Sequence, residues 1–168
     1  QIQSQESFLI TTISNDVFFN YYDEMPDISL IDTEFENSEI GTNANLSNSQ
    51  EMLILFYWDG IADTIKDVDY FLWGSSSQAV LKTIDQGYTY NDTNIEDQIF
   101  VRNYSTSTYS DSLYVRNSID EINENQTQGN GITGHDEISE DLSSSWGIEA
   151  YQNSIDFQDI IAGDYDCA

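Results

Sequence analysis

The 168 residues suffice for one domain with a real hydrophobic core. The chain has 31 acidic residues against four basic ones, Lys66, Lys82, Arg102 and Arg116, and its formal net charge is −27. Charge of this size makes nucleic acid and anionic membranes poor partners, and it favours divalent cations, basic proteins or a high-salt environment.

The N-terminal part of the chain predicts a strand followed by a second short element. Glu6–Ile13 is apolar and rich in β-branched residues, which is typical of a strand. Asn15 and Asp16 are good helix N-cap residues, so Val17–Tyr22 is either a short helix or another strand. The only proline, Pro26, ends any helix before it.

Two apolar runs in the middle of the chain give the clearest structural signal. Met52–Trp58 and Tyr70–Trp73 are short and rich in aromatic residues, and such runs predict buried β-strands. The connection between them is rich in carboxylates, at Asp59, Asp63, Asp67 and Asp69. We therefore predict two core strands of an all-β domain, with a candidate cation site at one end.

The second half of the chain predicts further short strands. Gln98–Tyr104 and Ser112–Asn117 alternate with the period of a half-buried strand, and the polar residues between them fit a hairpin connection. Gln78–Ile84 is a weaker strand candidate. A last apolar run, Leu142 to Ile148, precedes an acidic tail at residues 149–168. Seven or so short strands separated by turn signals predict a β-sandwich.

Two separated segments resemble the prokaryotic lamin-tail-domain family. LILFYWDGIADTIKDVDYFLWG, which ends at Gly74 and is followed by AVLKT, resembles that family's strand, Asp-Gly loop and strand ending in Trp-Gly. GNGITGHDEISEDLSSSW, at Gly129–Trp146, resembles its glycine-rich stretch before the last strand. The resemblance covers roughly residues 6–148. It implies an immunoglobulin-like β-sandwich that lacks the family's opening strands and has one short helix near residues 16–22.

The resemblance also implies a secreted or cell-surface module without catalytic residues. We expect a sandwich over residues 1–148 and a separate acidic tail over 149–168. A sandwich without its first strands exposes a groove that a neighbouring subunit's strand can fill. Ile155–Ile161 and Gln1–Ser7 are candidate donor strands, and the alternative is that the tail folds back on its own subunit. A head-to-tail contact that does not close gives a filament.

Two acidic segments are candidate metal sites. The first is the set Asp59, Asp63, Asp67 and Asp69, whose oxygens suit calcium, although the EF-hand pattern is absent. The second contains Asp136 and Glu137 beside His135. Calcium is favoured over zinc there because a zinc site usually needs more than one His or Cys. In both segments the alternative is a solvated acidic loop.

No catalytic group is predicted. His135 is the only histidine and the only cysteine, Cys167, lies in the tail, so the sequence offers no pair of nucleophile and base. We expect a structural module, not an enzyme, that assembles into a homo-oligomer, filament or surface layer and is stabilised by calcium. The alternative is an acidic binding protein, either a DNA-mimic inhibitor or a calcium-dependent adhesin. Neither nucleic acid nor a membrane span is expected.

Overall fold

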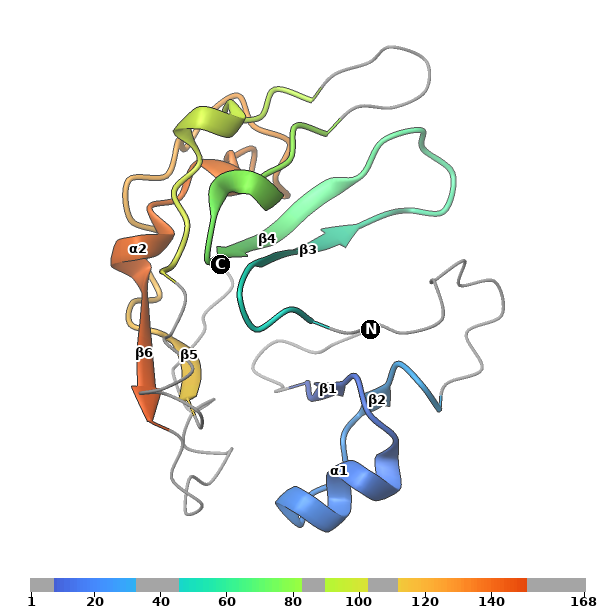
Figure 1. The fold of residues 1–168 in the computed structure, drawn as a ribbon. Coiled ribbons are helices and arrows are strands. Elements are labelled where there is room, and N and C mark those ends of the chain that lie inside the picture. Colours follow the sequence, from blue (N-terminus) through green and yellow to red (C-terminus); the bar gives the residue numbers. More distant parts are fainter. Residues whose placement is uncertain (1–7, 33–45, 83–89, 103–111, 151–168) are drawn as a thin grey trace. The chain divides into compact units, whose positions relative to one another are not determined.

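The computed structural model describes residues 8–32, 46–82, 90–102 and 112–150 (Figure 1). The chain divides into two compact units, one made of Gln1–Ser47 with Asp156–Ala168 and the other of Asn48–Ile155. The described residues form a β-rich fold, with six strands paired into three two-stranded sheets and two short α-helices. The domain predicted over residues 1–148 includes residues of both units.

The described part of the first unit contains the predicted helix. β1 (Ile10–Thr11) pairs in parallel with β2 (Ile28–Ser29), and α1 (Asn15–Tyr22) lies between them in sequence. The helix confirms the helical alternative for residues 16–22. It ends at Asp23, whose φ of 57° is left-handed, as at many helix C-termini.

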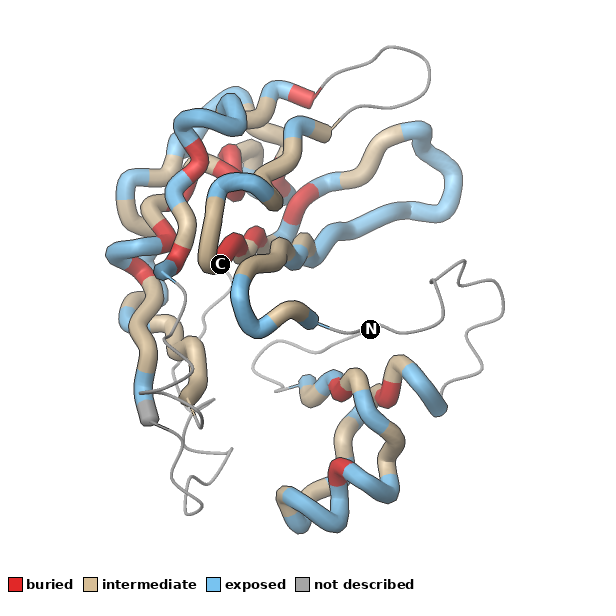
Figure 2. The backbone as a smooth tube through the Cα atoms, in the orientation of Figure 1, coloured by how far each residue is buried: buried red, intermediate tan, exposed pale blue. Residues whose placement is uncertain are grey.

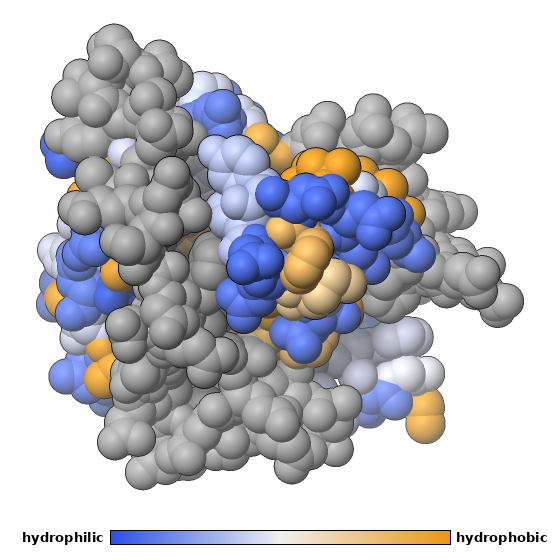
Figure 3. Space-filling model, turned by 90° about the horizontal axis from the view of Figure 1, so that it is seen from below, coloured by the Kyte–Doolittle hydropathy of each residue, from blue (hydrophilic) through white to orange (hydrophobic). Residues whose placement is uncertain are grey.

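The first strand is much shorter than the predicted segment Glu6–Ile13, of which the structure describes residues 8–13. The N–H of Ile13 donates to the Thr11 hydroxyl, which turns the chain immediately after β1. Figure 3 shows hydrophobic side chains at the surface among hydrophilic ones. On the helix itself, Val17 and Phe19 are 54% and 42% exposed.

The second unit is built around an antiparallel hairpin. β3 (Glu51–Tyr57) pairs with β4 (Lys66–Trp73), and Met52 stands opposite Leu72. The register shifts between Leu55 and Phe56, so that β4 carries one extra residue there, Val68. A bulge of this kind reverses the alternation of side chains along the strand. Both predicted strands of the central segment are therefore present, but the second begins at Lys66, so that Asp67 and Asp69 lie in β4 and not in the predicted connection.

The expectation of two buried strands is correct for β4 and wrong for much of β3 (Figure 2). Tyr70 and Leu72 of β4 are at most 1% exposed, whereas Leu53 and Leu55 of β3 are 45% and 55% exposed. The reason is their place in the sheet. Within the described residues β3 pairs with β4 alone, so β3 is an outer strand. Met52 and Ile54 pack against the core, whereas the Leu53 and Leu55 face, and Phe56 near the end of the strand, are about half exposed.

The core of the second unit is small and partly aromatic. Its buried apolar members are Tyr70, Leu72, Trp73, Val101, Ile138 and Leu142. Backbone hydrogen bonds hold Val101 to β4: its N–H donates to the Leu72 carbonyl and its own carbonyl accepts from Gly74. Phe71 packs on Trp146, with ring centroids 4.4 Å apart. The core thus joins β4 to loops that are distant in sequence.

The C-terminal strands pair differently from the predicted hairpin. β5 (Ser112–Arg116) pairs antiparallel with β6 (Trp146–Ala150), which follows the short helix α2 (Leu142–Ser145). The expected hairpin partner, Gln98–Tyr104, makes only isolated bridges in its described residues, at Ile99 and Val101. Most of the residues that would connect such a hairpin lie outside the described residues.

The remaining expectations divide between corrections and undescribed segments. Ser76–Gln78 forms a 3-10 turn, and the chain from there to Lys82 is not a strand. Residues 149–150 of the predicted tail belong to β6, and 151–168 lie outside the described residues, as does Gln1–Ser7. Neither candidate donor strand is therefore among the described residues. No helix in the described part of the chain has the length and apolar character needed to cross a membrane.

Two glycines provide a matched test of the hairpin. Gly60 and Gly74 have nearly the same left-handed φ, +80° and +81°. A Cβ at Gly74 would collide with the carbonyl oxygen of Ser49, whereas nothing lies within 4 Å of one at Gly60. We expect Gly60→Ala to lower the free energy of unfolding by about 1 kcal/mol, the cost of the left-handed conformation alone. Gly74→Ala should cost clearly more, because the backbone must move.

Equilibrium unfolding in urea, monitored by tryptophan fluorescence, measures both variants on the same scale. Equal losses at Gly60 and Gly74 would contradict the close approach of the backbone at Ser49.

Candidate functional site

Lys82 forms ion pairs with two buried carboxylates in the second unit. Its Nζ lies 2.5 Å from Asp67 Oδ2 and 3.0 Å from Asp92 Oδ2. The Lys82 side chain is 10% exposed and both carboxylate side chains are 0% exposed. With its amide nitrogen turned toward them, Asn130 also donates to Asp67 and Asp92. One ammonium group thereby ties β4 to the loop that contains Asp92.

The bulge in β4 determines which carboxylate reaches Lys82. Asp67 stands opposite Phe56, and Tyr70 stands opposite Ile54, so the extra residue places Asp67 on the same face as Tyr70. That face is the buried one, and Asp67 is 0% exposed. Asp69 lies on the other face of the strand and meets a different cation.

Arg116, at the end of β5, pairs with a second set of carboxylates. Its Nη2 lies 2.9 Å from Glu140 Oε1 and 3.7 Å from Glu121 Oε1, and its Nη1 lies 3.5 Å from Asp69 Oδ1. The guanidinium also lies 5.5 Å from the centre of the Trp146 ring. The Arg116 side chain is 11% exposed. One guanidinium group therefore connects β4, β5 and the loop before α2.

Further carboxylates are buried near these cations. The Glu124 side chain is 1% exposed and its Oε1 has no hydrogen-bond partner in the described residues. Glu137 and Asp136 are 7% and 4% exposed, and Asp136 Oδ1 likewise has no described partner. Burial raises the pKa of Glu137 to about 8, and the negative charge of Glu121 adds to this effect. Burial, assisted by Glu121, also raises the pKa of Glu124.

Glu121, Glu124 and His135 converge on one point. One potential ligand atom of each lies within 4.8 Å of the others. His135 Nδ1 lies 2.8 Å from Glu124 Oε2 and 4.0 Å from Glu121 Oε2. Among the described residues, this is the one set of three or more His, Cys, Asp or Glu side chains with ligand atoms so close.

Backbone hydrogen bonds hold the two segments of this set together. The Asp136 N–H donates to the Asn125 carbonyl, and the Asp141 N–H donates to the Ile122 carbonyl. The Asn125 N–H donates to the Ser139 hydroxyl at 2.7 Å. These bonds place residues 121–125 alongside 135–141 and bring the glutamates to His135.

The structure uses the four predicted aspartates of the central connection in three ways. Asp59 and Asp63 are exposed, and Asp59 Oδ1 accepts the N–H groups of Ile61 and Ala62, which closes a turn and lowers the Asp59 pKa. Asp67 pairs with Lys82 and Asp69 with Arg116. The four side chains do not converge as one ligand set.

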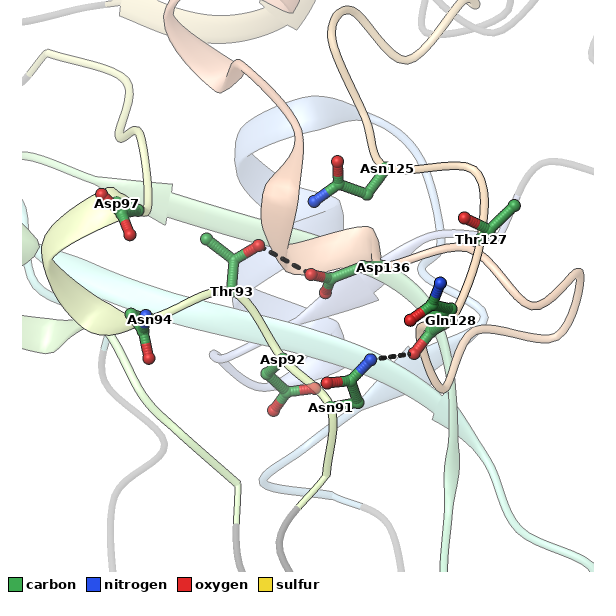
Figure 4. A pocket seen from close by; sticks show the side chains of 9 residues that line it. All are labelled: Asn91, Asp92, Thr93, Asn94, Asp97, Asn125, Thr127, Gln128 and Asp136. Carbon is green, nitrogen blue, oxygen red and sulfur yellow. Dashed lines mark hydrogen bonds between the residues drawn. The ribbon is translucent and has the colours of Figure 1, made fainter.

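Asp136, predicted as a calcium ligand, lines a polar pocket of about 500 Å³ (Figure 4). Thr93 Oγ1 donates to Asp136 Oδ2 at 2.7 Å across this pocket. The oxygen-bearing side chains around it include the carboxylates Asp92 and Asp97 and the amides Asn91, Asn94 and Asn125. Carboxylate and amide oxygens are the donors that calcium prefers, so the pocket offers suitable chemistry for a hydrated calcium ion.

Glu121 and Glu124 were not predicted as site residues. His135 was recognised, but zinc was disfavoured there because a zinc site usually needs more than one His or Cys. The spacing Glu-x-x-Glu carries little information in a chain with 31 acidic residues. Only the pairing of the two loops brings these glutamates to the histidine.

No family model, curated protein or solved structure matches this chain. The chemistry of the site therefore follows from its own geometry, in which many carboxylates surround two buried cations and one histidine.

The raised pKa values predict that stability falls as pH rises. The folded chain keeps protons on Glu124 and Glu137 that the unfolded chain releases above the ordinary value of 4.5. This contribution is complete below pH 4.5 and is lost as pH rises through about 8. The pKa values of Asp59 and Asp141 are lowered, so these two carboxylates change the pH dependence of stability only below about pH 3.8 and not between pH 4.5 and 8.

Urea unfolding in a chelator at several pH values between about 5 and 8.5 measures this slope. We expect Glu137→Gln to flatten it, and the exposed variant Glu96→Gln to leave it unchanged. A free energy of unfolding that increases over this range would contradict the buried position of these glutamates.

Proposed function

We propose that this chain is a non-catalytic structural module that binds calcium and assembles with copies of itself outside the cell. The observation that carries the proposal is the imbalance of buried charge. Two cationic side chains, Lys82 and Arg116, share the interior of the second unit with a larger set of almost fully buried carboxylates: Asp67, Asp92, Glu124, Asp136, Glu137 and Glu140.

A buried carboxylate without a cation is unfavourable unless it takes up a proton. Near neutral pH, a divalent cation offers the other way of removing the charge. Calcium accepts six to eight oxygen ligands in flexible geometry, which suits loops better than a rigid site would. The pocket beside Asp136, with Asp92 and Asp97, supports calcium at this position.

The site favours a structural role over a catalytic one. His135 is the single histidine, and among the described residues its Nδ1 faces the carboxylates of Glu121 and Glu124 and not a hydroxyl or thiol that it could activate. The network around Lys82 and Arg116 joins strands to loops, as a structural network does. The similarity of its motifs to lamin-tail-domain proteins supports an immunoglobulin-like sandwich and an extracellular or cell-surface location.

The exposed face of β3 supports self-association. Leu53, Leu55 and Tyr57 are each about half exposed on that face, and the strand has a single charged residue, Glu51. Outer strands of soluble proteins usually carry lysine, proline or inward charges that prevent pairing with other chains. β3 has none of these protections, so a strand from another copy can add to its edge.

Calcium should stabilise the folded chain. We expect millimolar CaCl2 to raise the melting temperature relative to the same buffer with EDTA, because calcium binds the folded carboxylate loops and not the unfolded chain. Asp136→Asn should reduce the increase, while Asp63→Asn in the exposed connection should not. Differential scanning fluorimetry at constant ionic strength separates this effect from general screening. An unchanged melting temperature in EDTA would refute the calcium part of the proposal.

Lysine substitutions on β3 should weaken self-association. We expect the pair Leu53→Lys and Leu55→Lys to shift sedimentation velocity profiles at high concentration toward the monomer, because each lysine places a hydrated charge on the pairing strand. Ile61→Lys is the matched control, since Ile61 is 88% exposed but lies outside β3. A wild-type chain that remains monomeric at all concentrations, with calcium present, would remove the assembly proposal.

A further inference from the structure

We propose that Glu121, Glu124 and His135 form a binding site for a transition-metal dication of the zinc class. The site is separate from the calcium pocket beside Asp136, because it uses different residues and a nitrogen ligand. Its three ligand atoms lie within 4.8 Å of one another and come from two loops that backbone hydrogen bonds hold together.

The donor set selects the class of ion. Imidazole nitrogen suits zinc, iron, copper and nickel, whereas calcium and magnesium prefer oxygen alone. One histidine with two carboxylates provides three protein ligands and leaves a fourth position for water, which is the ligand count of catalytic zinc sites, with fewer nitrogen ligands than those sites usually have. A site of this composition therefore prefers a transition metal to the calcium proposed for the pocket beside Asp136.

The distances fit a small ion. A tetrahedral ion with bonds of about 2.0–2.1 Å keeps its ligand atoms about 3.4 Å apart. His135 Nδ1 lies 2.8 Å from Glu124 Oε2 and 4.0 Å from Glu121 Oε2, values on either side of that spacing. Small side-chain rotations would equalise these distances without a change in the backbone.

Glu124 is the observation that points to a ligand. Its side chain is 1% exposed, its Oε2 faces His135, and its Oε1 has no hydrogen-bond partner among the described residues. Buried carboxylate oxygens are normally paired, and an unpaired one requires a cation or a proton. Glu121, Glu137 and Glu140 add negative charge around Glu124, and this charge attracts a dication as well as a proton.

Arg116 positions one of the ligands. Its Nη2 faces Glu121 Oε1 at 3.7 Å, which leaves the other oxygen of Glu121 directed toward His135. Partners of this kind orient a metal ligand without contacting the ion. The strongest contact of Arg116 is with Glu140 at 2.9 Å, so its charge is mainly offset there and does not exclude a dication.

Metal binding is best measured with the untagged full-length chain in saturating calcium. Isothermal titration with Zn²⁺ and Mn²⁺ gives stoichiometry and affinity, and Co²⁺ reports through its visible absorption whether nitrogen and oxygen ligands surround it. We expect one ion per chain. His135→Gln and Glu124→Gln should each weaken binding at least tenfold, and the exposed variant Glu96→Gln should bind like the wild type. Circular dichroism of each variant tests whether it is folded.

The outcomes separate this inference from the calcium proposal. If the His135→Gln variant loses the Co²⁺ absorption but keeps the calcium-dependent increase in melting temperature, both the metal site and the calcium proposal are supported. Stoichiometric Zn²⁺ binding without any effect of calcium on melting supports the metal site and refutes the calcium proposal. Unchanged affinity in folded His135→Gln, or loss of all Zn²⁺ binding when calcium is added, would overturn the inference, since both results indicate general attraction to acidic surfaces.

Discussion

The structure of the second unit depends on two buried cations that are each shared by several carboxylates. Lys82 pairs with Asp67 and Asp92, and Arg116 pairs with Asp69, Glu121 and Glu140. Each pairing crosses a long stretch of sequence: Arg116 and Asp69, for example, are 47 positions apart. Because the apolar core is small, these polar contacts determine how the loops pack on β4. Removing one buried partner would leave several charges unpaired, which costs more than the pair itself contributes.

The same network makes the stability of the fold depend on the pH and on the cations in solution. The carboxylates that exceed the two buried cations must take up protons, bind metal ions or remain charged at a cost in stability. Acid pH and divalent cations therefore act on the same groups and substitute for one another. The three-residue set at His135 and the pocket beside Asp136 differ in how they remove charge. The first offers nitrogen to a transition metal, and the second offers only oxygen.

The sequence predicted local structure better than long-range arrangement. Runs of apolar and alternating residues predicted the strands at residues 51–57 and 112–116 and the last four residues of β4, whereas residues 66–69 of β4 were assigned to the connection. The helix at 15–22 was one of two alternatives for its segment, and its N-cap is Ser14, so that the predicted capping residues Asn15 and Asp16 lie inside it. The burial of β3 could not be predicted, because Met52–Trp58 is apolar on both faces and so does not indicate which face meets the core. The pairing of β5 with β6 was also missed. Strands that are distant in sequence carry no local signal that identifies them as partners.

For the candidate site, too, the sequence indicated which residues could take part but not which of them lie together. The aspartates of the central connection were correctly recognised as a carboxylate-rich segment, but one bulge residue, Val68, places Asp67 on the buried face and Asp69 on the other. Alternation alone assigns both aspartates to one face. In the same way, Glu121 and Glu124 become partners of His135 only through the backbone pairing of two loops.

The four cationic side chains are divided between the interior and the surface of the second unit. Lys82 and Arg116 are buried, while Lys66 and Arg102 are exposed. Two exposed cations cannot balance the acidic residues that remain, so two copies of the chain repel each other at long range. Salt or bound dications reduce the range of that repulsion. The exposed, uncharged face of β3 is then the surface on which contact between two copies carries the smallest electrostatic cost. The proposed cation binding in the second unit and the proposed association between copies of the chain would therefore be coupled through charge, even though they involve different residues.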